Sequence, residues 1–137
     1  MIGQVLVNVE TSLFGLKRYV CSWAADSAGM AEIDFDNHAA PLINGDPVRL
    51  VTVPSESRPP TAGYDVKLLT RNDFDILDGA GANRSATAIE TVGVRNILSG
   101  GVRFVSNQSL GELRLRIENT GSGGGGIIVA YVLHQGA

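Results

Sequence analysis

The chain has 137 residues, which fits one domain, and 11 basic against 14 acidic side chains give a formal net charge of −3. The charges are interspersed, and without a basic stripe we expect no direct contact with nucleic acid. No segment approaches the roughly 18 apolar residues of a membrane span, so we expect no membrane partner. A single cysteine, Cys21, excludes an intramolecular disulfide and is interpreted as a small core residue.

The first part of the chain alternates apolar and polar residues with a period of two, which is typical of strands with one buried face. Residues 5–9 predict an opening strand, and residues 19–23 predict a second strand with Tyr19, Cys21 and Trp23 on one face. Residues 26–29 form a predicted turn. The strand at 31–35 follows it, so we expect a hairpin.

The middle of the chain is richer in proline and glycine. Residues 37–46 read as a loop, and residues 48–53 as a strand that is apolar on both faces. A proline-rich connection excludes helix and inner strand, and a strand is predicted at 64–69. A turn then leads into a short run at 74–77.

Residues 85–91 are open between one helical turn and a poor strand. A short strand is predicted at 102–105. The clearest strand places Leu113, Leu115 and Ile117 inward, and Arg114, Arg116 and Glu118 outward. Residues 121–126 predict a glycine-rich hairpin, and residues 127–133 a strand that is apolar on both faces and therefore central or covered.

Together these segments predict an all-β chain of about eight to ten short strands with almost no helical periodicity. We expect an antiparallel β-sandwich of the jelly-roll type with about eight strands, and an immunoglobulin-like sandwich is the second choice. Residues 1–137 form one domain in this interpretation. Within it, residues 1–15 are a candidate arm that docks on a neighbour or is exchanged between copies.

No constellation of residues points to an enzyme, a metal site or a cofactor. His38 and His134 are far apart, and Asp34 with Asp36 lacks the flanking oxygen ligands of a calcium loop. The segments 79–84 and 121–126 fail as phosphate-binding loops because no strand–loop–helix unit surrounds them, so both are predicted turns. No serine lies in a Gly-x-Ser-x-Gly elbow.

Two features favour contact with other proteins. The strands at 48–53 and 127–133 are apolar on both faces, but a sandwich buries only one face of each strand. We expect the second face to be covered either by the chain's own loops or by a partner. The second feature is a pair of complementary stripes, which are either solvated surfaces or a surface that orients docking. They are the candidate partner-binding residues Glu32, Asp34, Asp36, Arg114 and Arg116.

The order of four segments is suggestive: Lys17–Tyr19 opening a strand that ends at Trp23, then residues 59–66, 78–84 and a glycine-rich turn into 127–131. In this order the chain resembles the capsid cement, or decoration, proteins of tailed bacteriophages, over residues 17–133. The resemblance implies a structural virion protein, made in the host cytoplasm and placed on the outer surface of the capsid. There it would bind the major capsid protein as a dimer or trimer and stabilise the shell.

A rival interpretation is a carbohydrate-binding jelly-roll module of a phage tail fibre or receptor-binding protein. Such sites use exposed aromatic side chains as stacking platforms, and Trp23 lies among predicted core residues. A head–tail joining protein is a third possibility that differs from a cement protein only in its partner.

Overall fold

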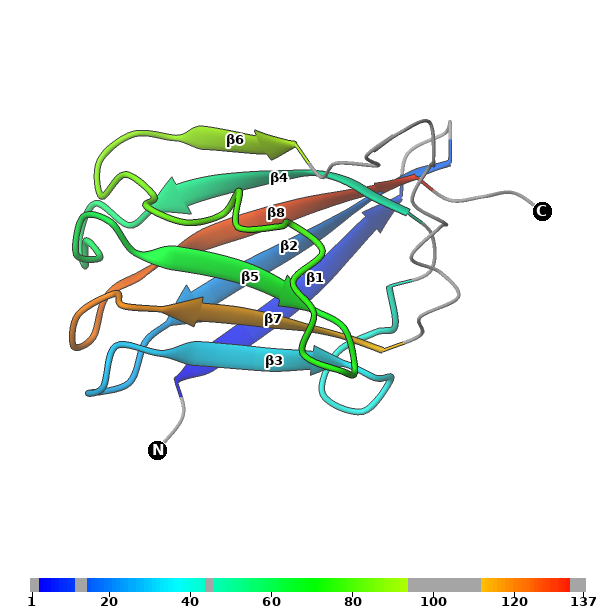
Figure 1. Ribbon diagram of the computed structural model, residues 1–137, viewed down its shortest axis with the longest axis horizontal. Helices are drawn as coiled ribbons and strands as arrows, with labels where there is room; N and C mark the ends of the chain where they lie inside the picture. Colours follow the sequence, from blue (N-terminus) through cyan, green and yellow to red (C-terminus); the bar gives the residue numbers. More distant parts are fainter. Residues whose placement is uncertain (1–2, 12–14, 44–45, 94–111, 134–137) are drawn as a thin grey trace.

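The structure is a computed structural model that describes residues 3–11, 15–43, 46–93 and 112–133 (Figure 1). The predicted strand at 102–105 and His134 lie outside the described residues. None of the described residues belongs to a helix that could cross a membrane. The strands are β1 (Gln4–Thr11), β2 (Leu16–Ala24), β3 (Ala31–Phe35), β4 (Asp46–Pro54), β5 (Asp65–Leu69), β6 (Glu90–Gly93), β7 (Leu113–Glu118) and β8 (Gly125–Leu133).

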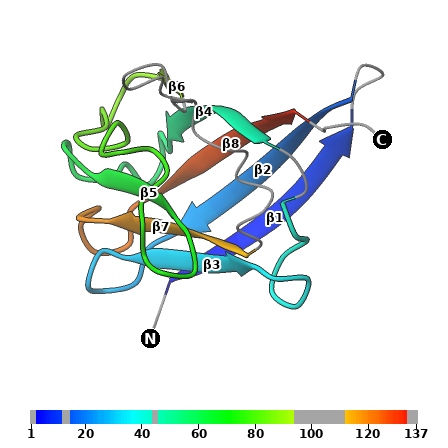
Figure 2. The same ribbon diagram turned by 45° about the vertical axis from the view of Figure 1, so that its right-hand side comes forward.

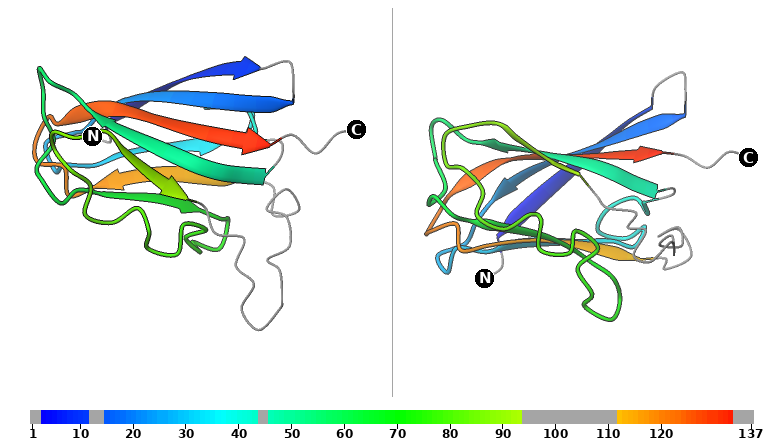
Figure 3. Two further views of the ribbon diagram at one scale, coloured as in Figure 1. Left: turned by 90° about the horizontal axis from the view of Figure 1, so that it is seen from above. Right: turned by 45° about the horizontal axis from the view of Figure 1, so that its top comes forward.

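The eight strands form two antiparallel sheets that stack face to face (Figure 3). The larger sheet has the order β1-β2-β8-β4-β6, and the smaller has the order β3-β7-β5. From β2 to β8, each strand lies in the sheet opposite to the strand before it. An immunoglobulin-like sandwich keeps several consecutive strands in one sheet, whereas this alternation is the connectivity of a jelly roll. The predicted all-β sandwich is confirmed.

Two turns predicted as hairpins connect the two sheets instead. β2 pairs with β1 and β8, whereas β3 pairs with β7. The segment 25–30 therefore crosses between sheets, and so does the segment 119–124 between β7 and β8. The prediction was wrong because turn residues look alike in a hairpin and in a crossover, and pairing between distant strands decides between them.

Backbone hydrogen bonds tie these two crossing loops to each other at one end of the sandwich. Thr120 N–H donates to the carbonyl of Gly29 at 3.2 Å, and Gly123 N–H donates to the carbonyl of Asp26 at 3.2 Å. Gly29 has φ +80°, and a Cβ added there would lie 3.0 Å from the backbone nitrogen of Gly121. Both the positive φ and the close approach of the loops therefore require glycine at position 29.

The core fills the space between the two sheets, and aromatic pairs join them. The ring of Tyr19 on β2 meets the ring of Phe35 on β3 edge to face, with centroids 6.0 Å apart. Trp23, also on β2, packs against Tyr64 just before β5, with centroids 5.7 Å apart. Cys21 lies between them on the same inward face and is buried. The predicted inward face of residues 19–23 is confirmed.

The segment between β5 and β6 is mostly irregular and packs along the edge of β5. Residues 74–77 form a loop along the free edge of β5, where Ile76 N–H donates to the carbonyl of Leu68 at 2.9 Å. For residues 85–91, where one helical turn and a poor strand were both open, residues 86–88 form a bend, and only Glu90 and Thr91 belong to a strand, β6, which pairs with β4. A turn precedes it, in which the Ser85 hydroxyl accepts the N–H groups of Thr87 and Ala88.

Candidate functional site

The outer surface of the three-stranded sheet is charged. We call it the charged face, and its charged residues on β3, β5 and β7 are Glu32, Asp34, Asp65, Lys67, Arg114, Arg116 and Glu118. Strand register places Glu32 opposite Arg116 and Asp34 opposite Arg114. Four of the five predicted partner-binding residues therefore lie side by side on one surface.

Ion pairs within the chain already satisfy most of this charge. Glu32 Oε2 lies 2.6 Å from Arg116 Nε and 3.7 Å from Arg114 Nε. Arg114 also pairs with Asp73, and Lys67 Nζ lies 2.6 Å from Glu118 Oε1. The hydrogen bond to Glu32 raises the pKa of Arg116, as Glu118 raises the pKa of Lys67. The acidic and basic stripes thus complement each other. Within the described part of the chain, Asp34 and Asp65 are the members without an ion pair, and Asp65 accepts hydrogen bonds from Asn83 and Asn119 instead.

Asp36, the fifth predicted residue, has a local structural role. Its carboxylate accepts the backbone N–H groups of His38 at 2.8 Å and Ala39 at 2.9 Å. These two hydrogen bonds hold the pKa of Asp36 below its ordinary value, because they stabilise the ionised carboxylate. Asp36 Oδ1 therefore stabilises the turn after β3.

The outer surface of the five-stranded sheet is mostly apolar. We call it the apolar face, and its residues are Leu6, Val20, Val51, Val53, Ile127, Val129, Tyr131 and Leu133. Leu6 is 62% exposed, Leu133 45% and Ile127 36%. Val129 is buried at the centre because Val20 and Val51 flank it on the neighbouring strands. No segment among the described residues lies over this side of the sheet (Figure 3).

One end of the apolar face is basic. The guanidinium of Arg18 lies 5.6 Å from the ring centroid of Tyr131 and donates a hydrogen bond to Glu10 at 2.8 Å. Arg49 lies opposite Tyr131 on its other side, on β4, and is exposed. An aromatic ring with an arginine on both sides can contact apolar groups and carboxylates together.

The strands that are apolar on both faces, 48–53 and 127–133, were recognised in the sequence, but Leu6, Arg18 and Arg49 were not. Leu6 carries a usable signal, since it is a large apolar residue on the polar side of an alternating strand. The juxtaposition of Arg18 with Arg49 has no local signal. It depends on the insertion of β8 between β2 and β4.

Two shallow hollows lie at the edges of these faces. One, of about 210 Å³, is lined by both acids and bases, among them Asp34, Glu112 and Arg114. The other, of about 240 Å³, has Gly125 and Gly126 in its lining, with Arg58 at its rim. The described residues contain no group of three or more His, Cys, Asp or Glu side chains arranged to hold a metal ion.

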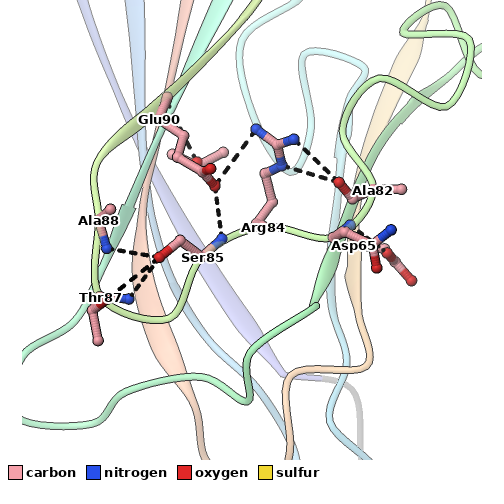
Figure 4. A network of polar contacts seen from close by, with 9 residues as sticks. Asp65, Ala82, Arg84, Ser85, Thr87, Ala88 and Glu90 are labelled. Atoms are coloured by element: carbon pink, nitrogen blue, oxygen red, sulfur yellow. Dashed lines mark hydrogen bonds and ion pairs between the residues drawn. The ribbon is translucent and has the colours of Figure 1, made fainter.

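Figure 4 shows the polar contacts that fix the loop before β6. Glu90 accepts the backbone N–H of Ser85 at 2.7 Å and lies 3.7 Å from Arg84 Nη1. The Asp65 carboxylate accepts the backbone N–H of Asn83 at 3.0 Å. The contacts join the first residues of β5 and β6, and the network is therefore structural.

The segment 79–84, which has glycines in the pattern of half a dinucleotide motif, is a turn as predicted. Its residues support β5: Gly81 accepts the N–H of Val66 through its carbonyl. A Cβ added to Gly81 would lie 2.1 Å from the carbonyl oxygen of Val66. Close backbone approach, and not phosphate binding, accounts for this glycine.

The fold and surfaces define a jelly-roll β-sandwich with one internally paired charged face and one apolar face. No protein-family model matches the chain, and no curated protein and no solved structure shows significant similarity to it.

Proposed function

We propose that this protein is a structural virion protein that binds the outside of an assembled capsid shell and bridges neighbouring major capsid protein subunits. The observation that carries the proposal is the apolar face. Ile127 and Leu133 are exposed toward the two ends of β8, half-buried apolar side chains of β2, β4 and β8 lie between them, and exposed Leu6 lies beyond Ser22 on β1. Contiguous exposed apolar surface on a small domain favours a protein interface. The order of segments that resembles decoration proteins supplies the identity of the partner.

The size of the apolar face suits such an interface. Strands of up to nine residues, four of them side by side, span about 20 by 30 Å. A stable protein–protein interface buries about 800 Å² on each partner, so the face and its rim are of the right order. The matching capsid surface would be apolar, with a carboxylate opposite Arg49.

Stabilisation of the shell follows from mass action. A protein that contacts two adjacent capsid subunits must dissociate before those subunits separate, so its binding free energy opposes rupture. At a concentration of about 100 times Kd, each bound copy contributes about 2.7 kcal/mol. Because a shell repeats its sites by symmetry, modest contacts of this kind add up.

The rival carbohydrate-binding function would rely on an exposed aromatic platform, and Trp23, its most obvious candidate, is buried against Tyr64. Among the described residues, the aromatic side chains nearer the surface, Tyr131 on β8 and Phe74 after β5, belong to different sides of the sandwich and form no shared platform, so we give priority to the capsid-binding proposal.

The proposal is tested by removing the protein from its native particles and adding it back. We expect stripped shells to rupture at a lower temperature, and the added protein to restore the original value. The variant Ile127→Lys with Leu133→Lys places two charges on exposed positions of the apolar face and should fail to restore it. Ile89→Lys, at a loop position that is 67% exposed, is the matched control and should restore it fully. Shells that are equally stable with and without the protein would refute the proposal.

A further inference from the structure

Among the residues that the structure describes, the two sheets have four edge strands, β1, β6, β3 and β5. An unprotected edge presents unpaired N–H and C=O groups to other strands, and proteins normally guard it. β5 is covered by its own chain, since Val66 N–H donates to Gly81 and Ile76 N–H donates to Leu68. β3 has five residues and carries Glu32 and Asp34, and β6 has four residues. These three edges are thus covered, charged or short.

β1 has none of these protections along most of its length. It has eight residues, without proline or lysine, and its one charged residue is Glu10, next to its end. Within the described part of the chain, the one backbone hydrogen bond on its outer side is from Gly3 N–H to Met30, just before the strand. Alternate residues of Gln4–Thr11 therefore direct their N–H and C=O groups to an open edge (Figure 2).

We propose that β1 pairs with β1 of a second copy of this chain, antiparallel and centred on Val7, so that the two five-stranded sheets become one continuous sheet. Centring on Val7 places Val5 opposite Val9 and Leu6 opposite Asn8 of the second copy. Apolar residues then share the inward face, because directly opposite residues point to the same side of a sheet. A two-fold axis repeats the same contacts in both directions and closes the assembly as a dimer.

The charges on β1 agree with this register. Glu10 lies opposite Gln4 of the second copy, so no like charges face each other directly. The two Glu10 carboxylates lie six residues apart along the pairing, or about 20 Å, which exceeds the Debye length of about 8 Å at physiological salt. Glu10 also remains in its ion pair with Arg18.

The exposure of the inward-facing valines of β1 agrees with pairing to a second β1. Val5 is buried, whereas Val7 and Val9 are only partly buried, because β3 approaches β1 at its beginning, where Gly3 bridges to Ala31. In the antiparallel pairing, the beginning of the second β1 lies beside the end of the first. The partner's β3 is then brought toward Val9, the end of β1 that its own smaller sheet leaves open (Figure 2). Burial of these valines would stabilise the dimer.

Sedimentation of the native chain tests association directly. We expect a concentration-dependent mass that rises toward twice that of the single chain. A single-chain mass at every concentration at which the protein stays in solution would overturn the proposal, and this test needs no variant.

Cysteine cross-linking tests the register. Val7→Cys places two thiols directly opposite each other, within the Cα separation of about 4.4–6.8 Å that a disulfide spans. Val9→Cys is the matched control on the same face, and its thiols lie four residues apart, about 13 Å. Cys21 is 1% exposed and does not compete. We expect Val7→Cys to form a covalent dimer under mild oxidation at least tenfold faster than Val9→Cys; equal rates would overturn the register.

The inference goes beyond the proposed function and is independent of it. A dimer that forms through β1 but leaves shell stability unchanged would refute capsid binding alone. A single chain that restores shell stability would refute only the dimer.

Discussion

At the scale of single residues, Trp23 is one of the aromatic side chains that join the two sheets. It belongs to β2, packs on Tyr64 from the other layer and is 4% exposed. We predict that Trp23→Ala lowers the free energy of unfolding by about 3–5 kcal/mol, as truncation of a buried aromatic does. Urea unfolding measures this value. Ile89→Ala is the control and should change stability by less than about 0.5 kcal/mol; equal stability of the two variants would place Trp23 outside the core.

Cys21 yields a prediction about reactivity. Burial raises the pKa of its thiol from 9.0 to about 12, because the thiolate loses its solvation. At pH 8 the folded protein then holds about one thiolate in ten thousand, and we expect a thiol reagent to label it only through unfolding. The unfolded chain ionises first as the pH rises, so Cys21 contributes stability below about pH 9 that declines up to about pH 12. Complete labelling within minutes under native conditions would contradict the buried position.

The inward positions of Trp23 and Cys21 could be predicted from the sequence because a strand with one buried face alternates strictly. The role of Asp36 could not. Its two backbone hydrogen bonds depend on how the chain turns after β3, whereas the sequence shows only that three acids alternate.

At the scale of elements, variants on the outward side of β7 distinguish the charged face from the apolar face as the docking surface. Reversal of Arg114 and Arg116 to glutamate places like charges beside Glu32. We expect the variant to remain folded with a loss of about 1–2 kcal/mol, since partly exposed ion pairs are each worth up to about 1 kcal/mol. A swap of Arg116→Glu with Glu32→Arg should recover part of the loss caused by Arg116→Glu alone.

The same variant bears on docking. Because the charged face is paired within the chain, we expect reversal of Arg114 and Arg116 to leave shell binding within about threefold of the original affinity, about 0.6 kcal/mol. Ile127→Lys with Leu133→Lys should abolish it. A co-sedimentation assay with stripped shells measures both. The opposite ranking would make the charged face the docking surface, as the sequence alone suggested.

Most strands could be predicted because their patterning is local, and β7 is the clearest example, with Leu113, Leu115 and Ile117 inward. Their pairing could not be predicted from the same signal. β2 and β3 are separated by a turn rich in hairpin residues, yet β2 lies between β1 and β8. Backbone hydrogen bonds between the loops at 26–29 and 120–123 stabilise the connection from one sheet to the other. Hydrogen bonds between loops that are distant in the sequence produce no periodic pattern of residues from which they could be predicted.

At the scale of the whole molecule, the alternation of strands between two sheets places five strands in one layer and three in the other. The smaller layer pairs most of its outer charges within the chain, whereas the larger layer exposes apolar side chains and the long edge of β1. The jelly roll itself could be predicted from the number and spacing of strands. Which face is left for a partner could not, because it depends on the order of strands within the larger sheet.

The proposed function and the proposed dimer use different parts of the same sheet. The apolar face lies on the outer surface of β1, β2, β8 and β4, whereas the pairing surface is the edge of β1. A dimer would therefore present two apolar faces on one side of a continuous sheet, which suits contact with two adjacent capsid subunits.

Electron cryomicroscopy of the native particles is the most direct measurement. We predict jelly-roll density on the outside of the shell, with the layer that contains Ile127 and Leu133 against the major capsid protein and the layer that contains Glu32 and Arg116 toward solvent. Particles that lack this density, or copies bound with Ile127 and Leu133 exposed to solvent, would contradict the account.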